Sequence, residues 1–154
     1  MNMKEITLAS IKEFTRQEAF AIAGVSRNKN KFGSALYRDL KKHGYKVFPV
    51  NPNMDTFEGD VCYKDIASLP EETGGIVIAT SPGHTVQLIN DAKTKGIKHI
   101  WLQMGAENPE SIEIAQNDDL NIIYKKCVFM YMEPVKFPHS FHRSFVKLFG
   151  RYPK

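Results

Sequence analysis

The sequence predicts an α/β fold of the Rossmann type, with a parallel β-sheet of about five strands flanked by helices on both faces. Three observations lead to this class. Short apolar runs alternate with amphipathic segments, several runs stop at glycine or proline, and the first run leads into a glycine-bounded loop before a helical segment. Such alternation favours parallel strands joined by right-handed crossovers. Residues 1–154 are predicted to form a single domain.

The first predicted helix covers about residues 6–16, because Leu8, Ile11 and Phe14 recur at helical spacing with polar residues between them. Residues 20–25 follow as a nearly continuous apolar run that reaches a glycine. A run of this kind is typical of a central strand that is buried on both faces of a sheet. It therefore predicts the first central strand.

A helix is predicted next over residues 33–43, with Gly44 at the position where a helix C-terminus favours a left-handed residue. The second strand covers residues 45–50. It stops at Asn51-Pro52-Asn53, because proline has no backbone N–H to donate to a neighbouring strand. Strand, loop, helix and strand thus form one complete unit.

The rest of the chain continues this alternation less evenly. Residues 53–70 are irregular, with one short helix predicted near residues 65–69. An amphipathic helix with an aromatic stripe is predicted near the C-terminus, where it would pack on its own core or a second copy, or contact a partner protein or a membrane surface. The remaining strands are predicted at 75–80, 97–102 and 122–124, and the remaining helices at 85–95, 109–117 and 138–149.

Composition excludes several classes of protein. The chain is 42% hydrophobic and 25% charged, and it contains no apolar run near the roughly 18 residues of a membrane span. Cys62 and Cys127 lack the spacing of a disulfide framework or a metal site. The net charge of +4 is spread along the chain and does not indicate nucleic-acid binding. We therefore expect a cytoplasmic protein that binds neither metal nor nucleic acid.

The loop after the first strand combines features that suit a pyrophosphate. Gly24 would let the backbone approach the phosphates, and Ser26 would donate a hydrogen bond. Arg27 or Lys31 would neutralise charge, and Gly33 would begin a helix whose dipole favours anions. The alternative interpretation, a solvated basic turn, remains open from these residues alone.

This loop differs from other nucleotide-binding loops. Ser26 stands where the dinucleotide fingerprint G-x-G-x-x-G has its second glycine, and no GxxxxGK[ST] motif is present. The second strand ends without the acidic residue that usually binds the ribose diol of NAD. An NAD site remains the alternative prediction.

Two other predicted strands end in polar segments. Thr80-Ser81-Pro82 follows the third strand, and its hydroxyls are expected to cap the next helix, to contact a ligand, or both. Residues 102–106, which include Gln103, form the end of the fourth strand and the segment after it. In an open parallel sheet these loops lie together beyond the C-terminal strand ends, so they belong to the candidate binding site.

Four segments in this order resemble the small single-domain CoA-binding proteins and the CoA-binding domain of the succinyl-CoA synthetase alpha subunit. The resemblance covers roughly residues 20–134. It is carried by AIAGVSRNKNKFG, VFPVNPN, EGDVCYKDIASLP and GIKHIWLQMGAE.

The resemblance implies that coenzyme A lies across the strand ends, with its phosphates on the first loop and its adenosine flanked by the segments that follow the second and third strands. The residues concerned in the first loop are Gly24, Val25, Ser26, Arg27, Lys31, Phe32 and Gly33. Those beyond the other strands are Asn51, Pro52, Asn53, Thr80, Ser81, Pro82 and Gln103.

The expected role is that of a binding module, which carries coenzyme A or an acyl-CoA or senses its level. The resemblance assigns no residue to catalysis, because the phosphorylated histidine of the synthetase belongs to a second domain. An acidic residue of the synthetase is also replaced here by Met104. The alternatives are an NAD-binding oxidoreductase and a subunit of an acyl-CoA ligase.

Overall fold

The computed structural model describes residues 3–117 and 119–132, in which five parallel strands form one sheet. The strand order is β2-β1-β5-β6-β7, and helices cover both faces, which confirms the predicted fold class. The strands are β1 (Ala19–Ala23), β2 (Lys46–Val50), β5 (Gly75–Ile78), β6 (His99–Gln103) and β7 (Asn121–Lys126).

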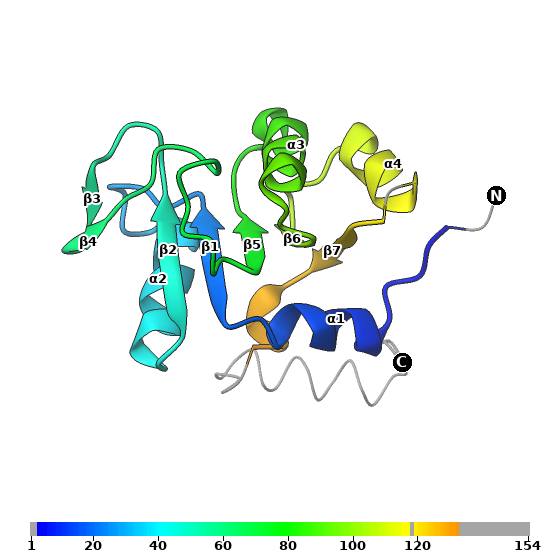
Figure 1. Ribbon diagram of the computed structural model, residues 1–154, viewed down its shortest axis with the longest axis horizontal. Helices are drawn as coiled ribbons and strands as arrows, with labels where there is room; N and C mark the ends of the chain where they lie inside the picture. The colour runs from blue at the N-terminus through cyan, green and yellow to red at the C-terminus, as the bar shows by residue number, and fades with distance from the viewer. Residues whose placement is uncertain (1–2, 118, 133–154) are drawn as a thin grey trace.

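The helices divide into two layers. Figure 1 shows α1 and α2 on one side of the sheet and α3 and α4 on the other. The helices are α1 (Leu8–Thr15), α2 (Phe32–Lys42), α3 (Thr85–Lys95) and α4 (Pro109–Asn117), with the 3-10 turns η1 (Pro82–His84) and η2 (Val128–Met130). The first helix thus falls inside the range expected from the sequence, whereas the expected helix 138–149 lies outside the described residues.

The fully buried strand β1 joins the two halves of the core. Phe20 and Ile22 pack into the cluster beneath α1 and α2, whereas Ala21 and Ala23 pack into the cluster beneath α3 and α4. This alternation follows from the two-residue period of a strand. Its apolar character on both faces explains the continuous run in the sequence.

The strand order creates a crevice at one end of the sheet. From β1 the chain leaves through α2 to β2 on one side, whereas from β5 it leaves through α3 to β6 on the other. In open parallel sheets, ligands bind beyond the C-terminal ends of the strands at such a switch point. The polar segments singled out in the sequence all lie at this end.

The irregular region before β5 differs from the prediction. The short helix expected near residues 65–69 was wrong: these residues form bends and a turn, in which the Ser68 N–H donates to Asp65 Oδ1 at 2.8 Å. Aspartate often satisfies nearby backbone in this way, in competition with helix formation.

A hairpin that the sequence did not predict lies at the β2 end of the sheet (Figure 1). It consists of β3 (Thr56–Phe57) and β4 (Asp60–Val61). Glu58 and Gly59 form its turn with φ of 49° and 87°. A two-residue turn with both φ values positive suits hairpin twist, but glutamate is an uncommon residue in it.

Polar contacts fasten the hairpin to α2. Arg38 Nε lies 2.6 Å from Glu58 Oε1, and the Asp60 carboxylate accepts hydrogen bonds from the Tyr37 hydroxyl and from Lys41 Nζ. Burial, together with the contact with Asp60, raises the pKa of Tyr37. The bonds from Lys41 and Tyr37 lower the pKa of Asp60. The hairpin therefore has a fixed position beside the loop that follows β1.

Three backbone segments meet at Gly24. A Cβ at Gly24 would lie 2.4 Å from the carbonyl oxygen of Ala79, and a Cβ at Gly33 would lie 2.4 Å from the carbonyl oxygen of Gly24. Gly24 also has a φ of 122°, which side chains rarely tolerate. The start of α2 and the end of β5 therefore both pack directly against the end of β1.

Within the described residues, no helix is long and apolar enough to cross a membrane. The same part of the chain contains no group of three or more histidine, cysteine or acidic residues placed to hold a metal ion.

Replacing Gly33 by alanine is expected to lower the free energy of unfolding by about 1–3 kcal/mol, because the new methyl group meets backbone that cannot move aside. This clash exceeds the roughly 1 kcal/mol that alanine gains over glycine within a helix. Urea unfolding measures the change. Gly83→Ala is the control, since a Cβ there meets nothing within 4 Å. Equal stability of the two variants would contradict the close packing.

Candidate functional site

The loop between β1 and α2 is held at its base by two serines. The Ser26 N–H donates to Ser34 Oγ at 2.9 Å, and that hydroxyl donates in turn to the Ser26 carbonyl oxygen at 2.9 Å. Ser34 is fully buried in the first turn of α2. A buried hydroxyl that satisfies both backbone groups of one residue fixes the course of the loop at that residue.

The remainder of the loop is organised by its own side chains. Ser26 Oγ accepts a hydrogen bond from the Asn28 N–H at 3.1 Å, and Asn28 Oδ1 accepts one from the Asn30 N–H at 3.0 Å. As an acceptor, the Ser26 hydroxyl keeps its own proton for donation to a ligand.

The N-terminus of α2 opens toward this loop. Its first residues follow Lys31, the N-cap, whose side chain forms no capping hydrogen bond and is exposed. The first N–H groups of a helix have no partner within the helix and carry partial positive charge. The loop and the helix start thus form one electropositive backbone surface.

The end of β2 is tied to the same loop by Asn51. Its Nδ2 donates to the Val25 carbonyl oxygen at 2.8 Å, while its Oδ1 accepts from the Asn53 N–H at 2.8 Å. Pro52 and Asn53 are exposed beyond it. Asn51 therefore positions the neighbouring residues through both ends of its amide group.

A cavity of about 450 Å³ lies at the ends of β1, β2 and β5, and we call it the switch-point cavity. Val50, Ile66 and Leu88 give it apolar walls. Thr80 also lines it, and among the described residues the buried Oγ1 of Thr80 has no hydrogen-bond partner. The cavity thus combines apolar surface with a hydroxyl that is free to bond to a ligand.

The expectation that the hydroxyls of Thr80 and Ser81 cap the next helix was wrong. Ser81 is the N-cap residue of η1, but its side chain forms no capping hydrogen bond, and η1 separates both residues from α3. Pro82 begins this extra turn, which immediately precedes α3.

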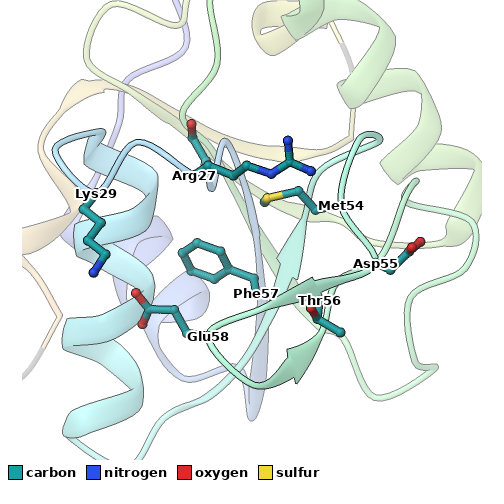
Figure 2. A pocket seen from close by; sticks show the side chains of 8 residues that line it. Arg27, Lys29, Met54, Asp55, Thr56, Phe57 and Glu58 are labelled. Carbon is teal, nitrogen blue, oxygen red and sulfur yellow. The ribbon is translucent and has the colours of Figure 1, made fainter.

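A second cavity of about 450 Å³ lies between the loop and the hairpin, and we call it the hairpin cavity (Figure 2). Arg27 extends from the loop over Met54, and the Phe57 ring lies below it. The Arg27 guanidinium donates to the Asn53 carbonyl oxygen at 3.4 Å. The lining residues are Ser26, Arg27, Lys29, Met54, Asp55, Thr56, Phe57 and Glu58.

The structure distributes the sequence-predicted residues over several positions. Gly24, Asn51, Pro52, Asn53 and Thr80 line the switch-point cavity, and Ser26 and Arg27 line the hairpin cavity. Val25 and Gly33 are buried beneath the loop, and Lys31, Ser81 and Pro82 are exposed near it. Ligand contact remains a prediction for each of them.

Two of the predicted residues make protein contacts instead of lining either cavity. The Phe32 ring packs against Phe129, with 5.2 Å between ring centroids. Gln103 is buried, and its Oε1 accepts a hydrogen bond from the Val128 N–H at 3.0 Å. Gln103 therefore connects the end of β6 to η2.

Sequence reasoning missed Ser34, Lys29 and the hairpin side of the site. Ser34 gives only a weak signal, because a serine near a helix start is ordinary in any protein. Lys29 was one of three cations in the loop, but only the folded hairpin shows which cavity it lines.

Both cysteines are buried. Burial raises the pKa of the Cys62 thiol, which disfavours the reactive thiolate. Cys62 thus has the environment of a packed core residue.

Sequence comparison shows similarity to acyl-CoA ligases. The chain is 26% identical over 126 residues to the alpha subunit of the ADP-forming acetate–CoA ligase II of Pyrococcus furiosus, which covers 75% of this chain and 28% of that protein. It spans 14%, 28% and 20% of the first three such ligases that it matches.

Solved structures of similar size share the fold. A hypothetical protein from Pyrococcus horikoshii aligns with a TM-score of 0.76 and 26% identity, over 88% of this chain and 99% of that one. A conserved hypothetical protein from Pyrococcus furiosus aligns with a TM-score of 0.69 and 32% identity, over 72% of this chain and 96% of that one.

One family profile covers most of the described structure. This profile is that of a CoA binding domain and matches residues 18–133. The match begins at the residue before β1 and extends past residue 132. This range contains the loop, the hairpin and both cavities. The prediction that coenzyme A is the cofactor is thereby confirmed. Because the match covers more than half of the chain, the protein belongs to the family of CoA-binding domains.

Proposed function

We propose that this protein binds coenzyme A or an acyl-CoA across the C-terminal ends of its strands, and that it acts as a carrier or sensor without chemistry of its own. The phosphates would contact the loop of residues 24–33. The proposal rests chiefly on one observation, namely that a rigidly held glycine and serine loop faces the uncapped start of α2.

The charge around the loop supports a phosphate ligand. Arg27, Lys29 and Lys31 are all exposed, and no acidic residue occurs between Gly24 and Gly33. Backbone N–H groups at a helix start bind phosphate oxygens, and cations nearby neutralise the remaining charge. The Ser26 hydroxyl would add one donor to this set.

The switch-point cavity suits the uncharged parts of the cofactor. Its apolar walls would hold a flat base or the pantetheine chain, and the unpartnered Thr80 hydroxyl would bond to one polar group of either. Gly24 has no side chain that would fill this space, and its backbone contacts Ala79 directly.

A role without catalysis is supported by the side chains around the loop. Asp55 and Glu58, the acidic residues of the hairpin cavity, form ion pairs with Lys64 at 3.0 Å and Arg38 at 2.6 Å. Both carboxylates are thus engaged by cations of the protein itself. The exposed Met104 after β6 carries no acid–base group.

The uncharged end of β2 argues against NAD. Asn51 uses its amide for the protein backbone, and Pro52 and Asn53 carry no charge. The acidic partner that usually binds the ribose diol is therefore lacking at this strand end.

A component of an acyl-CoA ligase is the second candidate, which the similarity to the Pyrococcus furiosus ligase subunit favours. Acylation of coenzyme A with ATP and acetate separates the two roles. A carrier or sensor forms no acetyl-CoA under any combination of chains, whereas a ligase component forms it once its complementary chain is added.

Isothermal calorimetry tests the binding proposal. The protein is expected to bind coenzyme A more tightly than NAD or ATP, and Lys31→Ala is expected to weaken coenzyme A binding by about fivefold, because one exposed phosphate contact is worth up to roughly 1 kcal/mol. Lys42→Ala removes the same charge from the far end of α2 and is expected to leave the affinity unchanged. Preference for NAD, or equal effects of the two substitutions, would contradict the assignment of the loop.

Ser34→Ala tests whether the shape of the loop matters for binding. Loss of both bonds to Ser26 is expected to lower the free energy of unfolding by about 1–3 kcal/mol and to weaken coenzyme A binding. Ser111 is a matched control, because it is equally buried and makes two bonds of 2.8 Å to the backbone of Asn108. Ser111→Ala should lower stability similarly in urea unfolding without changing the affinity; a similar loss of affinity would refute the proposed role of Ser34.

A further inference from the structure

We infer that the attachment of α1 to the sheet is sensitive to pH, because it depends on a histidine, His99, that must be uncharged. The helix is held at Ser10 while His99 is neutral, and protonation of His99 loosens it. His99 is the first residue of β6, at the end of the strands opposite the proposed coenzyme A site. The inference therefore goes beyond the proposed function and can be tested without a ligand.

The side-chain amide of Asn121 joins α1 to His99. Its Nδ2 donates to the Ser10 carbonyl oxygen at 2.8 Å and lies 3.2 Å from Nδ1 of His99. Asn121 and His99 are register partners in the neighbouring strands β7 and β6, and α1 packs against both strands. One amide nitrogen thus contacts both the helix and the histidine of the sheet.

The Ser10 carbonyl fixes the protonation state of His99. A carbonyl oxygen can only accept, so the Asn121 atom that faces it must be the amide nitrogen, which has two N–H donors. The second N–H is available to His99 Nδ1, which can accept it only as an unprotonated nitrogen. His99 therefore carries its proton on Nε2 and is neutral.

A charged His99 cannot keep this arrangement. Both ring nitrogens of a charged imidazole are donors, so Nδ1–H would face the N–H groups of Asn121. If the amide rotates to offer its oxygen to the imidazole, its nitrogen turns away from the Ser10 carbonyl. Protonation of His99 and the hydrogen bond from Asn121 to Ser10 thus exclude one another.

The surroundings of His99 also favour its neutral form. Burial lowers the pKa of His99, Glu13 of α1 acts in the opposite direction, and Lys98 lowers the pKa again. The register partners of His99 are Gly75 in β5 and Asn121 in β7, so neither neighbouring strand places a charge beside the ring. Because the folded-state pKa is lowered, the attachment is complete above the ordinary histidine value of about 6.5 and is lost as the pH falls from there through the folded-state value.

The helix α1 covers apolar surface that its loosening would expose. Ile11 and Phe14 are its buried residues, and the Phe14 ring packs against Trp101 with 5.3 Å between centroids. Trp101 is fully buried and is the only tryptophan of the chain. Acid therefore uncovers apolar surface beneath α1, and a red shift of the Trp101 fluorescence reports it.

Hydrogen exchange of the α1 amides tests the inference. In the unmodified protein their protection factors are expected to be about fivefold lower at pH 5 than at pH 8, as the loss of one hydrogen bond implies. His99→Gln keeps a side-chain acceptor for Asn121 but cannot be protonated, so its α1 protection is expected to be equal at the two pH values. His84→Gln is the matched control, because it removes an exposed histidine from the other end of the sheet and should leave the pH dependence intact.

NMR of the imidazole nitrogens checks the same inference without a substitution. His99 is expected to show the tautomer with its proton on Nε2 and to titrate below about pH 6.5. Asn121→Ala should raise the pKa of His99 and lower the α1 protection at both pH values, since the bond to Ser10 is lost. A proton on Nδ1 of neutral His99, α1 protection that is independent of pH in the unmodified protein, or an undiminished pH dependence in His99→Gln would each overturn the inference.

Discussion

The contact of three backbone segments at Gly24 determines the rest of the site. With the Ala79 carbonyl on one side and Gly33 on the other, the end of β1 touches both the end of β5 and the first turn of α2. Only glycine permits this spacing, because any Cβ would overlap a carbonyl oxygen. The helix start, the loop and Thr80 are consequently held together at the switch point of the sheet.

Hydrogen bonds between segments also hold the loop in place. Ser34 ties the loop to α2, and Asn51 ties it to the end of β2. The Arg38–Glu58 ion pair adds a link between α2 and the turn of the hairpin, and the Lys64–Asp55 ion pair joins the residues on either side of the hairpin.

The sequence predicted the features that depend on local pattern. The strand β1, the helices α3 and α4 and the parallel order follow from apolar periodicity and from terminal glycines such as Gly96, which has a φ of 91°. The hairpin was not predicted because Glu58 has a positive φ in its turn, where glycine, asparagine and aspartate are the usual residues. The loop glycines were found as a motif, but the role of Ser34 depends on a contact eight residues away.

The coenzyme A phosphates are expected to lie on the loop of residues 24–33, with the rest of the cofactor across the strand ends, and amide chemical-shift mapping by NMR tests this most directly. Titration of the labelled protein with coenzyme A should shift the amide signals of Ser26, Gly33, Asn53 and Thr80 together, with one common dissociation constant. Signals at the opposite ends of the strands, such as that of His99, should stay unchanged. Shifts confined to that opposite end, or absent from the loop, would contradict the location of the site.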